Sequence, residues 1–246
     1  MELFHILRIN LNSIMAKKIN INQIQGRTEL KYTHSPVRTT VYFLIVSEGT
    51  KTEPNYFETF IGKRGSKVVS VNCKGRGKNT TQLIAEAKKI QRQDRQRGKE
   101  YDSVWIVFDK DNFPDEAFNN AILAAPKDGI SVAWNNPSIE LWYLLHLVDT
   151  TKELTPEACI NEIEKIMKRQ IKSFKYDKAS SNFSWLNREV NQSKAIKRAK
   201  LLQQLKTDKP YAKQNPCTTV DKLVCQLIGE DEIFNNQVSN KIWEKL

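Results

Sequence analysis

Short apolar runs and longer amphipathic segments alternate along the middle of the chain. The first run, TTVYFLIVSEG at 39–49, is apolar at nearly every position before it ends at Gly49. A continuous β-branched and aromatic run of this kind is typical of a strand buried on both faces, as in a parallel sheet. Similar runs predict three further strands, at 67–73, 103–108 and 129–134.

Helices are predicted between these strands. Thr52 is expected to cap a helix that runs to about Gly62. Leu83, Ala87 and Ile90 form the apolar stripe of a second helix, over about 81–97. A third is predicted from about Pro114 to Ala125.

The segment NNPSIELWYLLHL predicts one more helix after the fourth strand. Asn136 is its expected N-cap, Pro137 its first helical residue, and Glu140 lies in its first turn. After residue 150 the pattern becomes helical, with segments at 156–171, 193–205 and 215–229.

This order of elements predicts an α/β fold. Alternating strands and helices favour a mainly parallel sheet with helices on both faces. Three regions are expected: a poorly ordered arm at 1–38, a core at 39–150, and a mostly helical region at 151–246 packed on that core.

Charge is distributed unevenly, and this changes the picture. The chain of 246 residues has a net charge of +11, which favours a polyanionic partner. Residues 62–100 carry 12 Lys and Arg against 3 Asp and Glu, and residues 165–213 carry 14 against 3. Residues 101–164 between them carry 3 against 12. Either these runs are solvated helix faces, or basic surfaces that hold phosphates flank an acidic centre.

Several classes of protein are disfavoured. No stretch approaches the roughly 18 consecutive apolar residues of a membrane span, and the N-terminal segment does not resemble a signal peptide. The four cysteines form no CxxC pair, which argues against a zinc site. We expect unpaired thiols in a reducing cytoplasm and no membrane partner.

Four acids follow the predicted strands. Glu48 follows the first strand, Asp109 and Asp111 the third, and Glu140 the fourth. Because residues i and i+2 of a strand share a face, both aspartates are expected to point at one spot. Neighbouring carboxylates repel one another unless a cation neutralises them, and oxygen ligands suit Mg²⁺ or Mn²⁺. Each acid alone also fits an ordinary turn or a helix-dipole role.

Other features receive a more limited interpretation. His146 is expected to be a core or helix-surface residue rather than part of the site. The glycine-containing GRGK loop lacks the spacing of a nucleotide-binding P-loop. Two basic surfaces are candidates for binding a nucleic-acid backbone, although the second equally fits a solvated helix face. They comprise Arg64, Lys67, Lys74, Arg76 and Lys78, and then Lys194, Lys197 and Arg198.

Four segments in this order resemble the motifs of the RloB-like family, which carries a TOPRIM-type domain. They are SEGTKTEPNYF, VFDKDNF, NPSIELWYLLH and NPCTTVDKLV. TOPRIM domains share a Glu after the first strand and an Asp-x-Asp after a later one, which here match Glu48, Asp109 and Asp111. The nuclease branch adds a Ser-x-Glu, matched by Ser138 and Glu140.

That nuclease branch also has a lysine and a second acid. Lys178 is the first choice for the lysine, with Lys175 and Lys194 behind it. The acid stands four residues after the first Glu, a position that Thr52 occupies here, with Glu53 one residue later. This departure puts a two-metal arrangement in doubt.

The resemblance implies a magnesium-dependent nuclease that acts in bacterial antiphage defence. Glu48, Asp109, Asp111 and Glu140 would hold metal, and Lys178 would stabilise negative charge. An ATPase of the AAA or ABC type is an implied partner, and RNA, including transfer RNA, or DNA an implied substrate. The alternative is a non-catalytic nucleic-acid-binding or adaptor subunit. Strand transfer or synthesis is a third hypothesis, but 246 residues leave little space for the separate domain with a nucleophilic tyrosine that topoisomerase chemistry needs, although Tyr176 and Tyr211 are present. A homo-oligomer is also left open.

Overall fold

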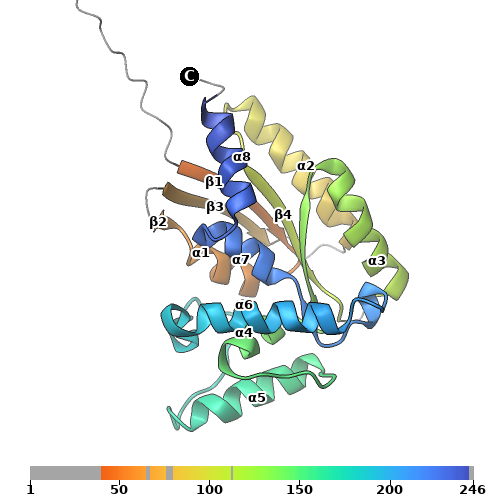
Figure 1. Cartoon of the computed structure of the whole chain (residues 1–246), viewed down its shortest axis with the longest axis vertical. Coiled ribbons are helices and arrows are strands. Elements are labelled where there is room, and N and C mark those ends of the chain that lie inside the picture. Colours follow the sequence, from red (N-terminus) through yellow and green to blue (C-terminus); the bar gives the residue numbers. More distant parts are fainter. Residues whose placement is uncertain (1–39, 65–66, 76–79, 112, 244–246) are drawn as a thin grey trace, which may run out of the picture. The chain divides into compact units, whose positions relative to one another are not determined.

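Four parallel strands lie at the centre of the fold (Figure 1). The computed structural model of the protein describes residues 40–243, apart from 65–66, 76–79 and 112. Side chains at 63–70, 72–81 and 242–243 are not described. The expected N-terminal arm at 1–38 lies outside the described residues.

The sheet has the strand order β2-β3-β1-β4-β5-β6. Its central strands β3, β1, β4 and β5 are parallel, while β2 and β6 add antiparallel edges. This confirms the α/β class and the mainly parallel sheet. The strands are β1 (Thr40–Ser47), β2 (Gly62–Arg64), β3 (Lys67–Gly75), β4 (Ser103–Asp109), β5 (Ser131–Asn136) and β6 (Cys217–Thr218).

The order of the central strands places a topological switch point between β1 and β4. The chain crosses from β1 to β3 on one side, and then returns past β1 to form β4 and β5 on the other. Ligand sites of open α/β sheets lie beyond the carboxyl ends of the strands at such a point. The residues that follow β1 and β4 are therefore the first place to look for a site.

Helices cover both faces of the sheet, because the strands present apolar side chains on both. On one face, α2 (Thr80–Gln96) and α3 (Asp115–Ala124) pack on residues such as Leu44 and Ile106. On the other face, Phe43 and Ile45 belong to a second core. This core includes residues of α1 (Thr52–Glu58), α4 (Ile139–Leu147), α5 (Pro156–Lys168), α6 (Arg188–Leu205), α7 (Val220–Ile228) and α8 (Glu232–Trp243).

Helix α4 is buried almost all round. Its residues from Ile139 to His146 are inaccessible to solvent, which explains why its sequence is apolar without an amphipathic period. Trp142 donates its Nε1–H to the hydroxyl of Tyr56 in α1 at 2.7 Å. His146 is buried as expected, with Nδ1 3.0 Å from the carbonyl of Trp142, and burial lowers its pKa to about 4.

Two predicted helix caps are wrong. Lys51, and not Thr52, is the N-cap of α1, and the Thr52 hydroxyl donates to the carbonyl of Lys178 at 2.8 Å. Asn136 is the last residue of β5 and donates its side-chain N–H to the carbonyl of Ala212 at 3.0 Å. Both side chains form hydrogen bonds with residues that are distant in the sequence. Rules based on local sequence alone therefore misplace the helix starts.

The segment after residue 150 contributes to the sheet as well as to the helices. Cys217 and Thr218 pair with Asn136 and Asn135 as the edge strand β6, which the sequence pattern assigned to the start of a helix. The side chain of Thr218 is thereby placed beside β5. Among the residues that the structure describes, no helix has the length and apolarity to cross a membrane.

Candidate active site

Glu48 and Asp109 meet at the switch point between β1 and β4. The backbone N–H of Glu48 donates to the carbonyl of Val107 at 2.9 Å, so the pairing of β1 with β4 continues one residue past the strand end. The backbone N–H of Asp109 lies 3.5 Å from Oε2 of Glu48. The parallel register therefore brings two acids together that are 61 residues apart in the sequence.

Hydrogen bonds fix the carboxylate of Asp109. Its Oδ1 accepts from the side-chain N–H of Asn135 at 2.9 Å, and its Oδ2 accepts from the backbone N–H of Ile139 at 3.1 Å. Thr218 in turn donates its hydroxyl to Oδ1 of Asn135 at 2.6 Å. The first turn of α4 adds the positive end of a helix dipole. Asp109 is thus held against β5, β6 and α4 together.

Glu140 lies beside Asp109 and is only 2% exposed. The hydroxyl of Ser138 donates to its Oε2 at 2.7 Å. The hydroxyl of Tyr176 donates to Oε1 at 3.2 Å, and Nζ of Lys178 stands 3.5 Å from the same oxygen. Ser138 and Lys178, both expected near the site, are therefore in contact with Glu140, whereas Tyr176 was not anticipated as a partner of an acid.

Glu53 is a further acid of this centre, which the sequence comparison had only noted as a departure. It lies in the first turn of α1 and is buried, at 4% exposure. The backbone N–H of Gly49 donates to its Oε1 at 3.2 Å. The available sequence signal was an acid four residues after the glycine that ends the first strand. We call Glu48, Glu53, Asp109 and Glu140 the acidic centre.

Burial and mutual repulsion disfavour negative charge in this centre. Burial, followed by the charges of Glu53 and Glu140, raises the pKa of Asp109 well above its usual range. Burial raises the pKa of Glu48 to about 7. The hydrogen bond from the N–H of Asp109 lowers this pKa, and the charges of Glu53 and Asp111 raise it further. Burial and the charge of Glu140 also raise the pKa of Glu53. The centre would gain from a cation that removed this repulsion.

Asp111 does not share a strand face with Asp109. Strand β4 ends at Asp109, and Asp111 lies in the turn beyond it with a φ of 24° and an exposed side chain. Its backbone N–H donates to the carbonyl of Pro137 at 3.1 Å. The expectation that Asp109 and Asp111 share a strand face is therefore wrong, because the alternation of side chains ends with the strand. Asp111 still contributes negative charge near Glu48.

The acidic centre has the donor type that magnesium or manganese prefers, but its side chains do not converge on one point. Among the described residues, no group of three or more His, Cys, Asp or Glu side chains is arranged to hold a metal ion. The carboxylate oxygens already have partners within the protein. Those of Asp109 accept hydrogen bonds from Asn135 and Ile139. Those of Glu140 contact Ser138, Tyr176 and Lys178. A cation here would require these carboxylates to turn.

A model of the RloB-like protein family matches residues 43–227. This chain belongs to the RloB-like family. The matched region contains the whole acidic centre as well as Ser138, Tyr176 and Lys178. A search of curated proteins and a search of solved structures gave no significant match.

In this RloB-like chain, a segment from the C-terminal region lies over the acidic centre. We define the strap as residues 172–187, between α5 and α6. Thr52 donates to the carbonyl of Lys178, and the side-chain N–H of Asn55 donates to that of Ala179 at 2.9 Å. The backbone N–H of Tyr176 donates to Glu164 at 3.0 Å. Helices α1 and α5 thus hold the strap where Tyr176 and Lys178 reach Glu140.

Only some of the predicted nucleic-acid-binding residues can be placed in the structure. The side chains of Arg64, Lys67, Lys74, Arg76 and Lys78 lie outside the described residues.

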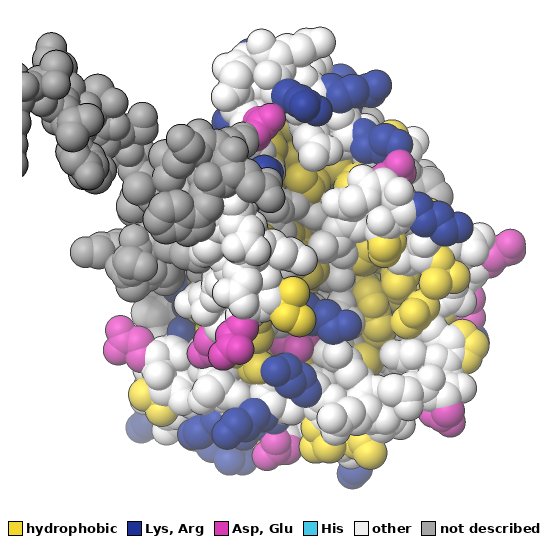
Figure 2. Space-filling model, turned by 45° about the horizontal axis from the view of Figure 1, so that its top comes forward, with side chains coloured by type: hydrophobic (Ala, Val, Ile, Leu, Met, Phe, Trp, Pro, Cys, Tyr) yellow, Lys and Arg dark blue, Asp and Glu magenta, His cyan; other side chains and the backbone are white. Residues whose placement is uncertain are grey.

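On α6, Lys194 and Lys197 are exposed. Arg198 instead donates to Asp149 at 2.7 Å and to the carbonyl of Leu145 at 2.7 Å, so it ties α6 to α4 and the residues after it. Lys and Arg side chains are scattered over the face seen in Figure 2 rather than gathered in one stripe. Lys175, a reserve choice for the lysine, is exposed on the strap.

Proposed function

We propose that this protein is a metal-dependent nuclease of the TOPRIM type that hydrolyses phosphodiester bonds of nucleic acid. The observation that carries the proposal is the acidic centre at the switch point, where α/β sheets bind ligands; burial, followed by neighbouring charges, raises the pKa of Glu48, Glu53 and Asp109 there. Chains avoid burying several carboxylates together without a compensating charge. A divalent cation would supply that compensating charge, and its remaining coordination positions suit water and a phosphate group.

Each residue of the centre has a role in this proposal. Glu48, Glu53, Asp109 and Glu140 would hold Mg²⁺ or Mn²⁺, with Asp111 nearby. The bound ion would neutralise charge on the phosphate and lower the pKa of a water. If Glu48 does not bind the ion, its pKa of about 7 instead gives it the proton affinity of a general base near neutral pH. Lys178 would stabilise the negative charge that develops on the phosphate oxygens.

Other side chains would position these groups. Asn135 orients Asp109, while Ser138 and Tyr176 orient Glu140. Such partners of ligand carboxylates commonly influence metal affinity.

The TOPRIM assignment and the biological setting rest on the sequence resemblance. A Glu after the first strand and an Asp-x-Asp after a later strand are the pattern of that domain class, and β1 and β4 supply both here. Membership of the RloB-like family suggests an effector of bacterial antiphage defence with an AAA- or ABC-type ATPase partner. RNA, including transfer RNA, and DNA are both candidate substrates, which the net charge of +11 favours.

A nuclease assay with matched variants tests the proposal. The protein is incubated with single- and double-stranded RNA and DNA in Mg²⁺ or Mn²⁺, alone and with a candidate ATPase partner of the AAA or ABC type. Asp109→Asn and Glu140→Gln should abolish cleavage. Asp128→Asn and Glu162→Gln make the same chemical changes at exposed ion pairs with Lys88 and Lys165, and should cleave like the wild type. Cleavage that survives Asp109→Asn would refute the metal mechanism.

A second candidate function is a non-catalytic nucleic-acid-binding or adaptor subunit. One observation favours it: the oxygens of Asp109 and Glu140 already face protein donors, and no described group of acids converges on a metal. Absence of cleavage on every substrate, with and without the ATPase, together with retained nucleic-acid binding, would support this function over the first.

A further inference from the structure

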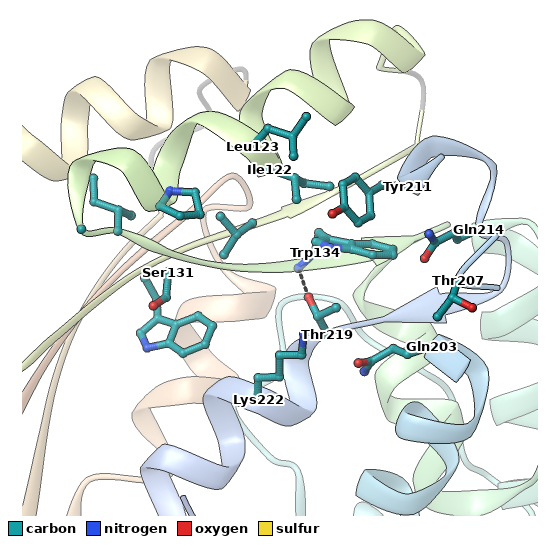
Figure 3. A pocket seen from close by; sticks show the side chains of 15 residues that line it. Ile122, Leu123, Ser131, Trp134, Gln203, Thr207, Tyr211, Gln214, Thr219 and Lys222 are labelled. Carbon is teal, nitrogen blue, oxygen red and sulfur yellow. Dashed lines mark hydrogen bonds between the residues drawn. The ribbon is translucent and has the colours of Figure 1, made fainter. Parts of the chain in front are cut away.

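A cavity of about 920 Å³ lies at the opposite edge of the central strands from β3 (Figure 3). None of the residues that line it belongs to the acidic centre. Ile122 and Leu123 of α3 border it on one side and Lys222 of α7 on the other, with the edge of β5 between them. Its volume lies within the range of roughly 300–1,000 Å³ that is usual for small-molecule sites.

The edge of β5 is only partly covered. Strand β6 pairs with Asn135 and Asn136. Thr219 then extends this pairing by one residue: its N–H donates to the carbonyl of Trp134, and its hydroxyl accepts from the N–H of Trp134, both at 2.9 Å. After that the chain leaves the sheet as α7. The half of β5 that precedes Trp134 therefore has no neighbouring strand on its outer side among the described residues.

Val132 leaves both its backbone donor and its backbone acceptor facing the cavity. The carbonyl of Asn135 accepts from Lys110 in the direction of β4, so alternate residues of β5 face outward, and these include Trp134 and Val132. At the start of this edge, the N–H of Ile130 donates to the carbonyl of Ala125 at 3.1 Å. No hydrogen bond of the described residues uses the outward N–H and C=O of Val132.

This single pair fits a nucleobase better than a polypeptide strand. A β-ladder needs several consecutive outward-facing residues, and here only Val132 offers both groups. A base edge such as that of adenine, with its N6 donor beside its N7 acceptor, matches one residue. The surroundings agree: Tyr211 packs on Trp134 with ring centroids 5.8 Å apart, and in Figure 3 Ile122 lies next to Tyr211, with Leu123 above them.

The charged and polar side chains of the cavity indicate what kind of ligand it could bind. Lys222 is its one charged side chain among the described lining residues, and it is exposed. Hydroxyl and amide groups come from Ser131, Thr207 and Gln214. An apolar floor, a few polar groups and one cation suit a heterocycle that carries a sugar and a phosphate. We propose that this cavity binds a nucleotide, with its base against Val132 and its phosphate at Lys222.

Binding of AMP, GMP, CMP and UMP to the full chain tests the proposal, with intrinsic tryptophan fluorescence, to which Trp105 and Trp134 of the cavity contribute, as one reporter and calorimetry as the second. At least one of the four should bind with a Kd below about 1 mM. Lys222→Gln should weaken that nucleotide by about tenfold and leave the matching nucleoside unchanged, because the charge-assisted contact is to phosphate. Lys89→Gln, an exposed lysine of α2, is the matched control.

Val132→Pro tests the backbone contact. Proline removes the outward N–H and is tolerated at a strand edge of this kind, so the chain should stay folded while nucleotide and nucleoside both bind more weakly. Val132→Thr keeps the N–H and should bind like the wild type. If no nucleotide binds, or if Lys222→Gln and Val132→Pro bind as well as the wild type, the site is refuted.

Two further measurements separate this site from the acidic centre and identify the source of the ligand. Asp109→Asn should bind the nucleotide like the wild type, whatever its effect on cleavage; a loss of binding would contradict an independent site. An unstructured single-stranded RNA is then added as competitor. Displacement of the bound nucleotide identifies the ligand as one unit of a nucleic acid, and persistence identifies it as a free nucleotide; either result supports the site.

Discussion

Gly49 lies directly against the carboxyl group of Glu53. A Cβ placed on Gly49 would stand 2.7 Å from the carboxyl carbon of Glu53, closer than real Cβ atoms come to another group. The N–H of Gly49 donates to the same carboxylate. A glycine at the exit of β1 is therefore needed to seat an acid of α1 in the acidic centre.

Gly49→Ala should consequently displace Glu53. We expect divalent-cation affinity and any nuclease activity to fall by about 10- to 100-fold, the range seen when a partner of a metal ligand is lost. Calorimetric titration with Mn²⁺ measures the first effect. Thr50→Ala changes the exposed neighbour and should have no effect. An unchanged affinity in Gly49→Ala would show that Glu53 does not take part.

Lys178→Met should remove activity without unfolding the protein. The amine of Lys178 is exposed and its ion pair with Glu140 lies partly in solvent, so its loss costs little stability. Loss of a group that stabilises transition-state charge typically costs about 10²- to 10³-fold in kcat. Lys175→Met, on the same strap, is the control. If both variants lose the same amount of activity, or if neither loses any, Lys178 does not have its proposed role.

The acidic centre should make stability depend on pH when divalent cations are chelated. Folding raises the pKa of Glu48 from 4.5 to about 7, so the folded state binds this proton more tightly than the unfolded state does. The resulting stabilisation is complete below pH 4.5 and is lost as the pH rises toward about 7. Glu48→Gln should lose less stability than the wild type across this window. Urea unfolding at several pH values in EDTA measures the difference, and identical profiles would contradict it.

Tyr56→Phe should destabilise the core beneath the acidic centre. The substitution leaves the buried Nε1–H of Trp142 without its acceptor. An unsatisfied buried donor costs about 1–3 kcal/mol, so the free energy of unfolding should fall by that amount. Chemical denaturation monitored by circular dichroism provides the measurement. A change well below 1 kcal/mol would mean that another group accepts from Trp142.

The sequence was sufficient for the parallel sheet, and for the positions of Glu48, Asp109 and Glu140 after their strands. Continuous apolar runs specify buried strands, and an acid directly follows the runs that end at Ser47 and Phe108. The same rules failed at Asp111, because apolar periodicity does not show at which residue a strand stops. They failed at Thr52 and Asn136 for another reason: a distant backbone carbonyl competes with the local helix end for each side chain.

Local sequence patterns could not predict contacts between residues that are far apart in the chain. Tyr176 and Lys178 reach Glu140 because Thr52 and Asn55 hold the strap, and neither contact has a periodic signature. The edge strand β6 consists of Cys217 and Thr218 alone, which is too short to be recognised by alternation. The cavity beside Val132 depends on that shortness, and so it too required the structure.

Binding of Mn²⁺ to the acidic centre tests the central claim most directly. The electron paramagnetic resonance signal of free Mn²⁺ decreases when the protein binds the ion, and this decrease gives the number of ions bound. The wild type and Asp128→Asn should bind Mn²⁺ equally, whereas Asp109→Asn and Glu53→Gln should lose this binding while remaining folded. If the wild type binds no Mn²⁺, or if Asp109→Asn binds as much as the wild type, the acidic centre is not a metal site.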